Sequence, residues 1–486
     1  MFDPLRNQAH ETDRCALLLG PEESLSRGRL NHAVDRVARA LLSPGKALVW
    51  CVGDHSLSTV LGYLGAMRAG HAAAFLPATG TAESVARIVH RYRPEFAVAD
   101  DGTARHLVRL GYLPVEAGPC TLYARRKSGG DPVDDHTALL LATSGSTGSP
   151  KAVRISAGAL AASTEAIVSA LAIDPKARAA GTLPIRYAYG LSVLNTHLWA
   201  GGSYLLTEEH PAALRVWHAI RRSGVTSFAG VPTTYRSLGR AHAQLLAGSQ
   251  IASMTQAGGR LADSLVLTWA ERMAARGGGF HVMYGQTEAT ARISVLHPAE
   301  LPAAVGSVGR ALPGGEIWTE PVDGHPEGEI CYRGPGVMSG YVEDREQLAV
   351  GGEPLEMLRT GDLGSVRGGL LHVSGRIKRI VKVLGYRVDL DDLERCVEPP
   401  EGQVVFVAAG DRIVMVVEAG WTGDREAVRR AVVELLGVPD ATVAGRFLKA
   451  IPRTYNGKCD YAALSRAVQG SPAAQEQVFD AEGAQP

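Results

Sequence analysis

Short apolar runs alternate with helix-like stretches through the first half of the chain, and this alternation limits the fold more than any other feature. Leu48–Val52 and Ala73–Pro77 have the composition of buried strands, and Thr59–Ala72 between them has the pattern of a helix that ends near Gly70. Similar units recur at Gly202–Leu206 and Val225–Val231. Strands that alternate with helices are typical of parallel sheets covered by helices, so the sequence predicts an α/β fold.

The pattern changes near Gly306, where turns rich in glycine and proline separate short strands such as Gly328–Arg333. We interpret residues 1–375 as a large N-terminal domain of parallel-rich sheets flanked by helices and closed by a small β-rich section. Residues 376–470 are long enough for a separate, small and mobile α+β domain. The polar composition of residues 471–486 predicts a disordered tail. Within the small domain we expect a basic turn at Gly375–Arg379, helices at Leu390–Val397 and Asp424–Leu436, and strands at Val404–Ala408 and Arg446–Ile451.

Composition argues against several kinds of partner. The 50 Lys+Arg and 50 Asp+Glu give a formal net charge of zero, so electrostatics favours neither nucleic acid nor an anionic membrane. No uncharged apolar run approaches the roughly 20 residues that span a bilayer, and no signal-peptide pattern is present. The six cysteines are scattered without a C-x-x-C pair. This spacing argues against a zinc site and against a disulfide framework, and it fits a protein of the reducing cytoplasm.

The strongest local signal is a loop of hydroxyls and glycines that follows the apolar run Leu139–Leu141. Glycines let backbone N–H groups converge on an anion, hydroxyls donate further hydrogen bonds, and a closing lysine adds charge. The spacing is not that of a Walker A motif. On composition alone, a phosphate-binding loop and a flexible surface loop are equally good interpretations. The candidate phosphate ligands are Thr143, Ser144, Gly145, Ser146, Thr147, Gly148 and Lys151.

Three further segments combine polar side chains with turns, and each alone is weak evidence. Tyr284–Glu288 offers an aromatic ring that could stack on a base and a carboxylate that could hold Mg²⁺. Thr360–Asp362 places a carboxylate at a tight turn, where it could accept two ribose hydroxyls or act only as a cap. Pro452–Lys458 places a lysine on an Asn-Gly turn, where a solvated side chain is the commoner finding.

Taken together, in this order and spacing, the segments resemble the motifs of the adenylate-forming superfamily. This superfamily includes acyl- and aryl-CoA synthetases, luciferases and peptide-synthetase adenylation domains. The matching segments are Thr143–Lys151 (phosphate loop), Tyr284–Glu288 (Y-G-x-T-E), Gly328–Tyr341 (GEICYRGPGVMSGY), Thr360–Asp362 with Gly375-Arg376 (T-G-D…G-R) and Pro452–Lys458 (P-[RK]-T-x-x-G-K).

The resemblance implies ATP and Mg²⁺ as cofactors and gives roles to the matching residues. The phosphate loop and Lys151 would hold the β- and γ-phosphates, Glu288 would ligate Mg²⁺, and Thr287 would contact the α-phosphate. The residues expected around the nucleoside are Gly258, Gly259, Arg260, Tyr284 and Gly285 at adenine, and Asp362 with Arg376 at the ribose. Those expected from the small domain are Lys458, bridging the attacking carboxylate and the α-phosphate, Lys378 as the hinge, and Gly385 in the thiol tunnel.

The segment that would line the acyl pocket departs from the superfamily pattern. Leu183–Leu191 resembles L-P-x-F-H-x-Y-G-L, but Arg186 and Tyr187 replace Phe and His; Tyr189 and Val231 complete the expected pocket. Members that activate α-amino acids carry an aspartate near here, and this chain has none, so a free α-amino acid is predicted to be a poor substrate. Arg186 either faces a second anionic group of the substrate or is a solvated or structurally paired arginine.

The resemblance thus implies a two-step reaction at a site between the two domains. A small-molecule carboxylic acid reacts with Mg·ATP to give an acyl-AMP and pyrophosphate. A thiol then takes the acyl group, and this thiol is either CoA or the phosphopantetheine of an acyl or peptidyl carrier protein. An amine or another nucleophile is an alternative acceptor, and a nucleotide-binding module without catalysis is an alternative from a different class of protein.

Overall fold

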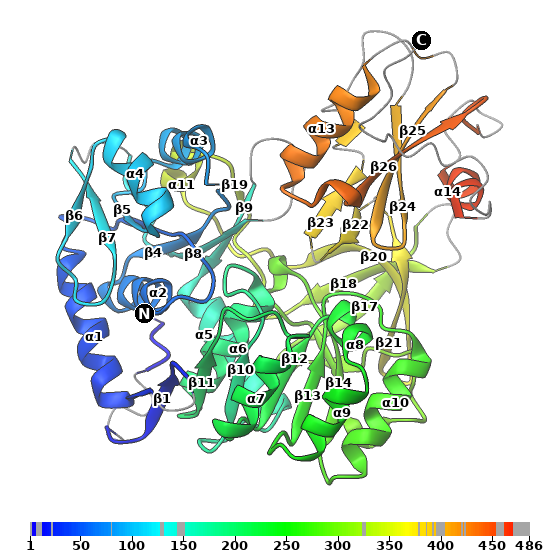
Figure 1. The fold of residues 1–486 in the computed structure, drawn as a ribbon, viewed down its shortest axis with the longest axis horizontal. Helices are drawn as coiled ribbons and strands as arrows, with labels where there is room; N and C mark the ends of the chain where they lie inside the picture. The colour runs from blue at the N-terminus through cyan, green and yellow to red at the C-terminus, as the bar shows by residue number, and fades with distance from the viewer. Residues whose placement is uncertain are drawn as a thin grey trace. The chain divides into compact units, whose positions relative to one another are not determined.

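The computed structural model describes the chain outside residues 1, 6–11, 21–22, 79, 127–130, 143–150, 323–326, 378–379, 385, 391–392, 395–403, 419–420, 422–423, 453–460 and 470–486. Contacts divide it into a first unit, which contains residues 1–142 and 151–375, and a second unit, which contains the chain from Arg376 onward. Figure 1 shows the elements of both units. None of the described helices combines the length and the apolar composition that crossing a membrane requires.

One large sheet of the first unit consists of β1 (Cys15–Leu18), β2 (Ser24–Ser26), β10 (Arg178–Gly181), β11 (Ser203–Leu206), β12 (Ser227–Gly230), β13 (Ser253–Gln256), β14 (Gly279–Tyr284), β15 (Ser294–Leu296) and β16 (Arg310–Ala311). Among the described residues its strand order is β16-β15-β14-β13-β12-β10-β11-β1-β2. The six strands from β1 to β14 in this spatial order pair in parallel. At the edges, β2 pairs antiparallel with β1, β15 with β14, and β16 with β15.

The second large sheet of this unit consists of β3 (Leu48–Cys51), β4 (Ala72–Phe75), β5 (Phe96–Val98), β6 (Tyr112–Val115), β7 (Leu122–Arg125), β8 (Thr137–Ala142), β9 (Ala152–Ser156) and β19 (Tyr341–Val342). Its central strands β5, β3, β4 and β8 pair in parallel. The predicted α/β class with parallel-rich sheets is therefore confirmed, and the strand at Leu48–Val52 forms with its end shifted by one residue.

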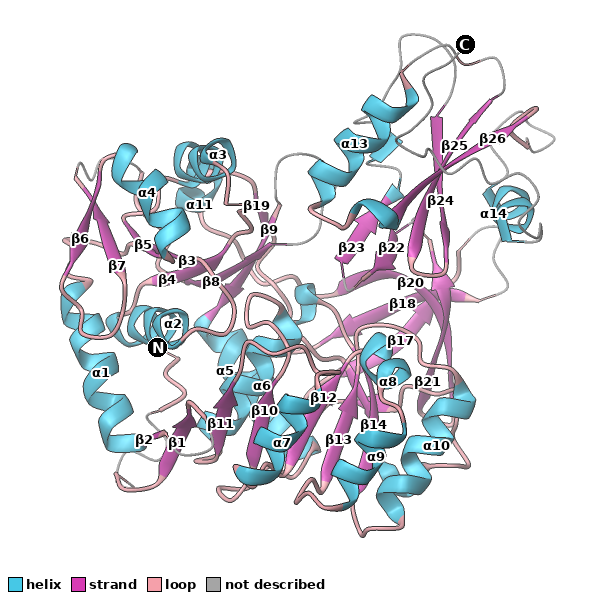
Figure 2. Cartoon of the chain, in the orientation of Figure 1, coloured by secondary structure: helices cyan, strands magenta, loops and turns pink. Residues whose placement is uncertain are grey.

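Helices cover the large sheets in layers, as Figure 2 shows by colour. The helices are α1 (Arg27–Ala40), α2 (Leu57–Ala69), α3 (Ala82–Tyr92), α4 (Asp101–Arg109), α5 (Ala157–Ala170), α6 (Ala188–Trp199), α7 (Leu214–Arg222), α8 (Pro232–Ser237), α9 (Arg240–Ala247), α10 (Asp263–Ala274) and α11 (Arg345–Val350). Side chains of α2, α5 and α6 share one core with both large sheets, so these helices lie between them. Helices α3 and α4 pack on the other face of the β3–β4 sheet, and α7 and α10 pack on the other face of the β12–β13 sheet.

Helix α2 shows how the local sequence produces this layer. The Ser56 side chain accepts a hydrogen bond from the Thr59 backbone N–H, an N-cap that stabilises a helix by about 1 kcal/mol. Gly70 ends the helix in the left-handed conformation (φ 79°), which glycine adopts without a Cβ clash. The helix thus ends at Gly70, as the sequence predicted, and it begins at Leu57, two residues before the predicted Thr59. At Gly62 a Cβ atom would lie 2.4 Å from a methyl carbon of Val98, so glycine allows the helix to pack close to β5.

A smaller sheet completes the first unit and forms the predicted β-rich section. It consists of β17 (Glu316–Glu320), β18 (Gly328–Arg333), β20 (Leu358–Arg367) and β21 (Leu370–Arg376), in the order β17-β18-β20-β21 among the described strands. Strand β21 continues through Arg376. The predicted turn therefore does not begin at Gly375, and its last residues, Lys378 and Arg379, lie outside the described residues.

The second unit contains β22 (Ile380–Val383), β23 (Tyr386–Asp389), β24 (Val404–Ala409), β25 (Arg412–Glu418), β26 (Val443–Leu448), α13 (Arg425–Leu436) and α14 (Tyr461–Gln469). Strands β24 and β25 are antiparallel, and β25 and β26 are parallel. The predicted helix at Asp424 forms as α13, with Asp424 as its N-cap. The last strand begins three residues earlier than expected, and most of the helix predicted at Leu390–Val397 lies outside the described residues.

Candidate active site

Parallel strands of the first large sheet end side by side where several predicted site residues lie. Gly230 of β12 pairs with Gln256 of β13, and Gln256 pairs with Val282 of β14. Val231 follows β12, Gly258 lies just after β13, and Tyr284 is the last residue of β14. Ligands of open α/β sheets bind beyond the carboxyl ends of the strands, so this edge is the expected place for a binding site.

Tyr284 and Asp362 meet at this edge although 78 residues separate them. The Tyr284 hydroxyl donates a hydrogen bond of 2.7 Å to Oδ2 of Asp362. Asp362 is only 3% exposed, so the carboxylate is held in a defined position. The residues that the sequence suggested for adenine and for ribose are therefore neighbours in the structure.

Asp362 lies in strand β20 and not in an isolated tight turn, which corrects the interpretation of the Thr360–Asp362 segment. Between the pairs Glu329–Leu363 and Cys331–Arg359 the register shifts, so the segment forms a bulge opposite β18. Gly361 takes the left-handed conformation (φ 70°), and its N–H donates to Glu329 Oε1 at 3.0 Å. A bulge redirects a side chain within a strand, and here it directs Asp362 toward Tyr284.

Glu288 lies in a short 3₁₀ turn, Thr287–Ala289, that directly follows β14. It is 3% exposed, and the Tyr341 hydroxyl donates to its Oε1 at 2.9 Å. The Met338 N–H also donates to the Glu288 carbonyl at 2.9 Å. These contacts bring the Tyr284–Glu288 segment against the end of the Gly328–Tyr341 segment, and the sequence did not predict Tyr341 as the partner of Glu288.

Lys151 lies beside this group because β9, which it precedes, pairs with β19 through Tyr341 and Val153. Its Nζ is 5.4 Å from the centre of the Tyr341 ring and 3.5 Å from Oε1 of Glu343. The side chain is half exposed, so its ammonium can reach a phosphate in solvent. Lys151, Tyr341 and Glu288 thus form a continuous polar group at the end of the sheet.

The carboxylate of Glu288 fits a role in holding Mg²⁺. Magnesium is usually bound through one or two carboxylates together with substrate phosphates and waters, and not by a complete protein cage. Among the described residues no cluster of three or more His, Cys, Asp or Glu could hold a metal on its own. A single buried carboxylate therefore fits a metal whose other ligands are phosphate oxygens and waters.

The segment expected at adenine follows β13 directly. Gly258 takes the left-handed conformation (φ 86°), and the Gln256 side-chain amide donates to the Gly259 carbonyl at 2.7 Å. Gly259 and Arg260 are exposed, so they can contact a ligand. At Gly285 a Cβ atom would lie 2.1 Å from the Ala291 carbonyl oxygen, which shows that only glycine fits there.

Arg186 forms an ion pair with Asp54, and its guanidinium carbon lies 4.9 Å from the centre of the Tyr187 ring. Of the two roles considered for Arg186, the structure shows the paired one. Asp54 lies just after β3, and 132 residues separate it from Arg186 in the sequence. Nothing in the local sequence indicated that the two side chains form a pair.

Tyr189 joins helix α6 to the strand ends. Its hydroxyl lies 2.9 Å from Oγ1 of Thr255 and 3.0 Å from the Thr255 carbonyl oxygen. The guanidinium carbon of Arg292 lies 4.0 Å from the centre of the Tyr189 ring. Burial raises the pKa of the Tyr189 hydroxyl and lowers the pKa of the Arg292 guanidinium. Sequence reasoning missed Arg292, although it lies only four residues beyond Glu288.

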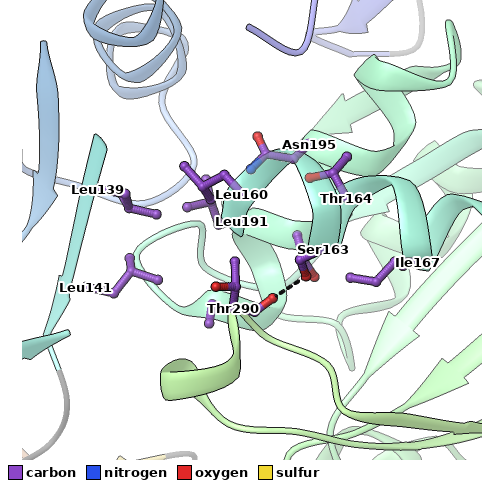
Figure 3. A pocket seen from close by; sticks show the side chains of 11 residues that line it. Leu139, Leu141, Leu160, Ser163, Thr164, Ile167, Leu191, Asn195 and Thr290 are labelled. Atoms are coloured by element: carbon purple, nitrogen blue, oxygen red, sulfur yellow. Dashed lines mark hydrogen bonds between the residues drawn. The ribbon is translucent and has the colours of Figure 1, made fainter. Parts of the chain in front are cut away.

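A small cavity lies between strand β8 and helices α5 and α6 (Figure 3). Its lining is part apolar, with four leucines, and part polar, with Asn195 and Thr164 on one side. Ser163 donates to the Thr290 carbonyl at 2.7 Å. The cavity has room for about one water. This cavity is too small to receive an acid substrate.

Several predicted site residues lie outside the described residues: Thr143, Ser144, Gly145, Ser146, Thr147, Gly148, Lys378, Gly385 and Lys458. The side chain of Arg376 is likewise outside the description. Their roles stay predictions. The residues that the structure does bring together are Tyr284 with Asp362, and Lys151 with Glu288 through Tyr341.

A family model described as "AMP-binding enzyme" matches residues 5–342. The chain is 27% identical over 481 residues to the indoleacetate–CoA ligase of Aromatoleum aromaticum, which covers 90% of this chain and 92% of the ligase. It is 27% identical over 452 residues to the hybrid PKS-NRPS synthetase TAS1 of Pyricularia oryzae, covering 85% of this chain and 25% of TAS1. The chain spans between 6% and 20% of the length of five further synthases and synthetases that it matches.

Among solved structures, the amide bond synthetase McbA of Marinactinospora thermotolerans has a similar fold. The TM-score is 0.76 at 26% sequence identity, and the match covers 96% of this chain and 100% of that one.

Proposed function

The chain belongs to the family of AMP-binding enzymes, the adenylate-forming ligases, and from that premise we propose that it activates a carboxylic acid as an acyl-AMP and transfers the acyl group to a thiol. The family membership confirms the resemblance that the sequence motifs suggested. Enzymes of this family use ATP and Mg²⁺, and small-molecule acids are their typical substrates.

In the first step, a carboxylate oxygen of the acid attacks the α-phosphorus of ATP, and pyrophosphate leaves. Two anions must approach each other, so catalysis depends on cations and oriented hydrogen-bond donors. A carboxylate is already ionised at neutral pH, and no general base is required. Bound Mg²⁺ would neutralise phosphate charge at Glu288.

Each described side chain has a part in this step. Asp362, held by Tyr284, accepts hydrogen bonds from the ribose hydroxyls, and Gly258–Arg260 and Gly285 flank the adenine. Lys151 binds phosphate oxygens together with residues 143–148, and Thr287 contacts the α-phosphate. The observation that carries the proposal is the buried carboxylate of Glu288, held by Tyr341 next to Lys151, at the carboxyl end of β14.

We further assign the large domain to residues 1–375, the small mobile domain to residues 376–470, and a disordered tail to residues 471–486. Lys458 of the small domain would bridge the attacking carboxylate and the α-phosphate. Lys378 would act as the hinge, Arg376 would lie near the ribose, and Gly385 would line the thiol tunnel. The division of contacts at Gly375 is consistent with a boundary at this position.

The acceptor is proposed to be a thiol, either CoA or the phosphopantetheine of a carrier protein, and the acyl pocket to include Arg186, Tyr187, Tyr189 and Val231. The similarity to a CoA ligase over 92% of that ligase supports CoA, and the similarity to peptide synthetases supports a carrier protein. The similarity to an amide bond synthetase over its full length favours an amine as the second candidate acceptor. The unpaired cysteines among the described residues, Cys15, Cys51, Cys120 and Cys331, fit a reducing cytoplasm.

The proposal is tested by exchange of labelled pyrophosphate into ATP, with a panel of aliphatic, aromatic, dicarboxylic and amino acids. We expect Mg²⁺-dependent exchange with at least one acid and little exchange with free α-amino acids. Glu288→Gln should lower the exchange at least about 10²-fold, because it removes the charge of the metal ligand. Glu316→Gln is the matched control, since Glu316 pairs with Arg333 on an exposed strand away from this edge.

The acceptor is identified by mass analysis of the product formed with CoA, carrier protein or amine. Absence of exchange with every acid, in a folded protein supplied with Mg²⁺, would contradict the proposed function.

A further inference from the structure

Arg292 is a buried cation with poor hydrogen-bond partners. It lies just before β15 and is 3% exposed. Its Nε donates to the sulfur of Met283 at 3.3 Å, and its Nη1 donates to the Ala291 carbonyl at 3.3 Å. A thioether sulfur is a weak acceptor, and the contact to the carbonyl is longer than usual. Within the described part of the chain, Arg292 forms no ion pair with a carboxylate.

Arg345 shows how a buried arginine of the same unit is normally satisfied. It is 2% exposed, and its two terminal nitrogens donate to Glu95 at 2.7 and 3.2 Å. Its Nε donates to the Asp131 carbonyl at 2.8 Å. A buried guanidinium without such partners loses its hydration without compensation, which destabilises a fold unless a ligand completes the site.

The position of Arg292 identifies the ligand that could do so. The guanidinium stacks on Tyr189, whose hydroxyl is bonded to Thr255 at the end of β13. It therefore lies among the carboxyl ends of the strands, on the side of the proposed acyl pocket. Arg186, the other arginine of that pocket, already forms an ion pair with Asp54, so it is less suited than Arg292 to bind an anionic group of the ligand.

An anion at Arg292 could be the reacting carboxylate or a second group of the same acid. The reacting carboxylate loses its charge when it becomes a mixed anhydride with AMP. A fixed cation that contacts only this carboxylate, and not the α-phosphate, would stabilise the reactant more than the transition state and would slow the step. A second anionic group keeps its charge through both steps, so a fixed, buried cation suits it. The planar guanidinium also matches a carboxylate with two parallel hydrogen bonds.

We propose that Arg292 binds a second carboxylate of the acid, so that the enzyme activates dicarboxylic acids, aliphatic or aromatic. This proposal rests on the proposed acyl-adenylating function and names its substrate class. One carboxylate of the acid attacks ATP, and the other stays ionised at Arg292.

The first test compares each dicarboxylic acid with its monoamide in the pyrophosphate exchange assay on the wild-type enzyme. The monoamide has the same shape and lacks the second charge. We expect kcat/KM to be at least about 30-fold higher for the best dicarboxylic acid than for its monoamide, as is typical for a charged partner of a buried arginine. Equal values for the two compounds would overturn the proposal.

The second test compares variants. Arg292→Met should abolish the preference mainly by lowering kcat/KM for the dicarboxylic acid, and Arg292→Lys should retain part of it. Arg272→Met is the control, because it also removes a guanidinium stacked on an aromatic ring, Trp269, but on the surface of α10. A folded Arg292→Met that keeps the full preference would show that another residue reads the second carboxylate.

The outcomes separate this proposal from the proposed function. If kcat/KM for exchange is as high with monocarboxylic acids and monoamides as with dicarboxylic acids, the role of Arg292 is refuted. The proposed adenylation activity is not affected by that result. No exchange with any acid refutes the proposed function itself. If the Arg292 variants do not fold, the wild-type ratio of dicarboxylic acid to monoamide still decides the substrate class.

Discussion

Replacing Tyr284 with phenylalanine removes one hydroxyl and nothing else from the candidate site. That hydroxyl donates to Asp362 at 2.7 Å, and the carboxylate is 3% exposed. In Tyr284→Phe the ring keeps its place at the end of β14, so its packing and any stacking on adenine are preserved. The substitution therefore tests only the hydrogen bond that holds the carboxylate.

The expected magnitude follows from the charge and burial of the acceptor. A hydrogen bond to a charged group contributes about 1.5–3 kcal/mol, and a buried carboxylate that loses a donor is not rehydrated by bulk water. The bond exists before ATP binds, so its loss should lower the free energy of unfolding by about 1.5–3 kcal/mol. The affinity for ATP should change much less, by no more than about threefold, because the bond is lost from the free and the bound enzyme alike.

Urea titration followed by tryptophan fluorescence measures the stability, since Trp50, Trp199, Trp217, Trp269 and Trp318 all lie in the first unit. Calorimetric titration with Mg·ATP measures the affinity. Tyr112→Phe is the matched control: its hydroxyl donates to the uncharged Pro94 carbonyl, and it should cost only about 1 kcal/mol with no effect on ATP. If Tyr284→Phe lowers the free energy of unfolding by no more than Tyr112→Phe does, the reasoning about the buried carboxylate is refuted.

Three further predictions concern the small domain and the backbone. Lys458→Ala should slow adenylation at least about 10²-fold and leave thioester formation from supplied acyl-AMP nearly unchanged, measured as separate half-reactions; equal losses would contradict the assignment. Lys378→Pro should fix φ at the proposed hinge, leaving adenylation largely intact and impairing thiol transfer, with an unchanged thermal melt as the control; two wild-type rates would exclude this hinge. Gly285→Ala should destabilise the fold by about 1–3 kcal/mol or more, because its Cβ would meet backbone atoms of Ala291 and Arg292, whereas Gly45→Ala, with no atom within 4 Å of its Cβ, should be neutral by thermal denaturation.

The elements whose signal is local were predictable from the sequence. The strand at Leu48 and the helix ended by Gly70 depend on apolar runs and on a glycine, and both appear with small shifts at their ends. The β-rich section also formed as expected around Gly328–Arg333. The helix boundary was misplaced because the actual cap, Ser56, lies outside the apolar pattern that suggested the helix.

The contacts that organise the site were less predictable because they join distant segments. Tyr341 reaches Glu288 across 53 residues, and Asp54 reaches Arg186 across 132. Such pairs depend on which strands are neighbours, and local periodicity carries no information on strand order. Motif resemblance placed Tyr284, Glu288 and Asp362 in one site, but it gave no reason to notice Arg292, whose significance comes from its burial and its missing carboxylate.

The two proposed cations, Arg292 and Lys458, differ in whether the carboxylate beside them keeps its charge through the reaction, so their effects should differ. A second carboxylate at Arg292 stays charged throughout, so a buried arginine fixed beside the strand ends can hold it. The reacting carboxylate is neutralised when the acyl-AMP forms, and a cation that contacts only this carboxylate would stabilise the reactant more than the transition state. Lys458 is proposed to touch the α-phosphate as well, so it also stabilises the negative charge that develops there in the transition state. On this reasoning, we expect Lys458 to affect the adenylation rate with every acid, and Arg292, which lies in the first unit, to affect the choice among acids.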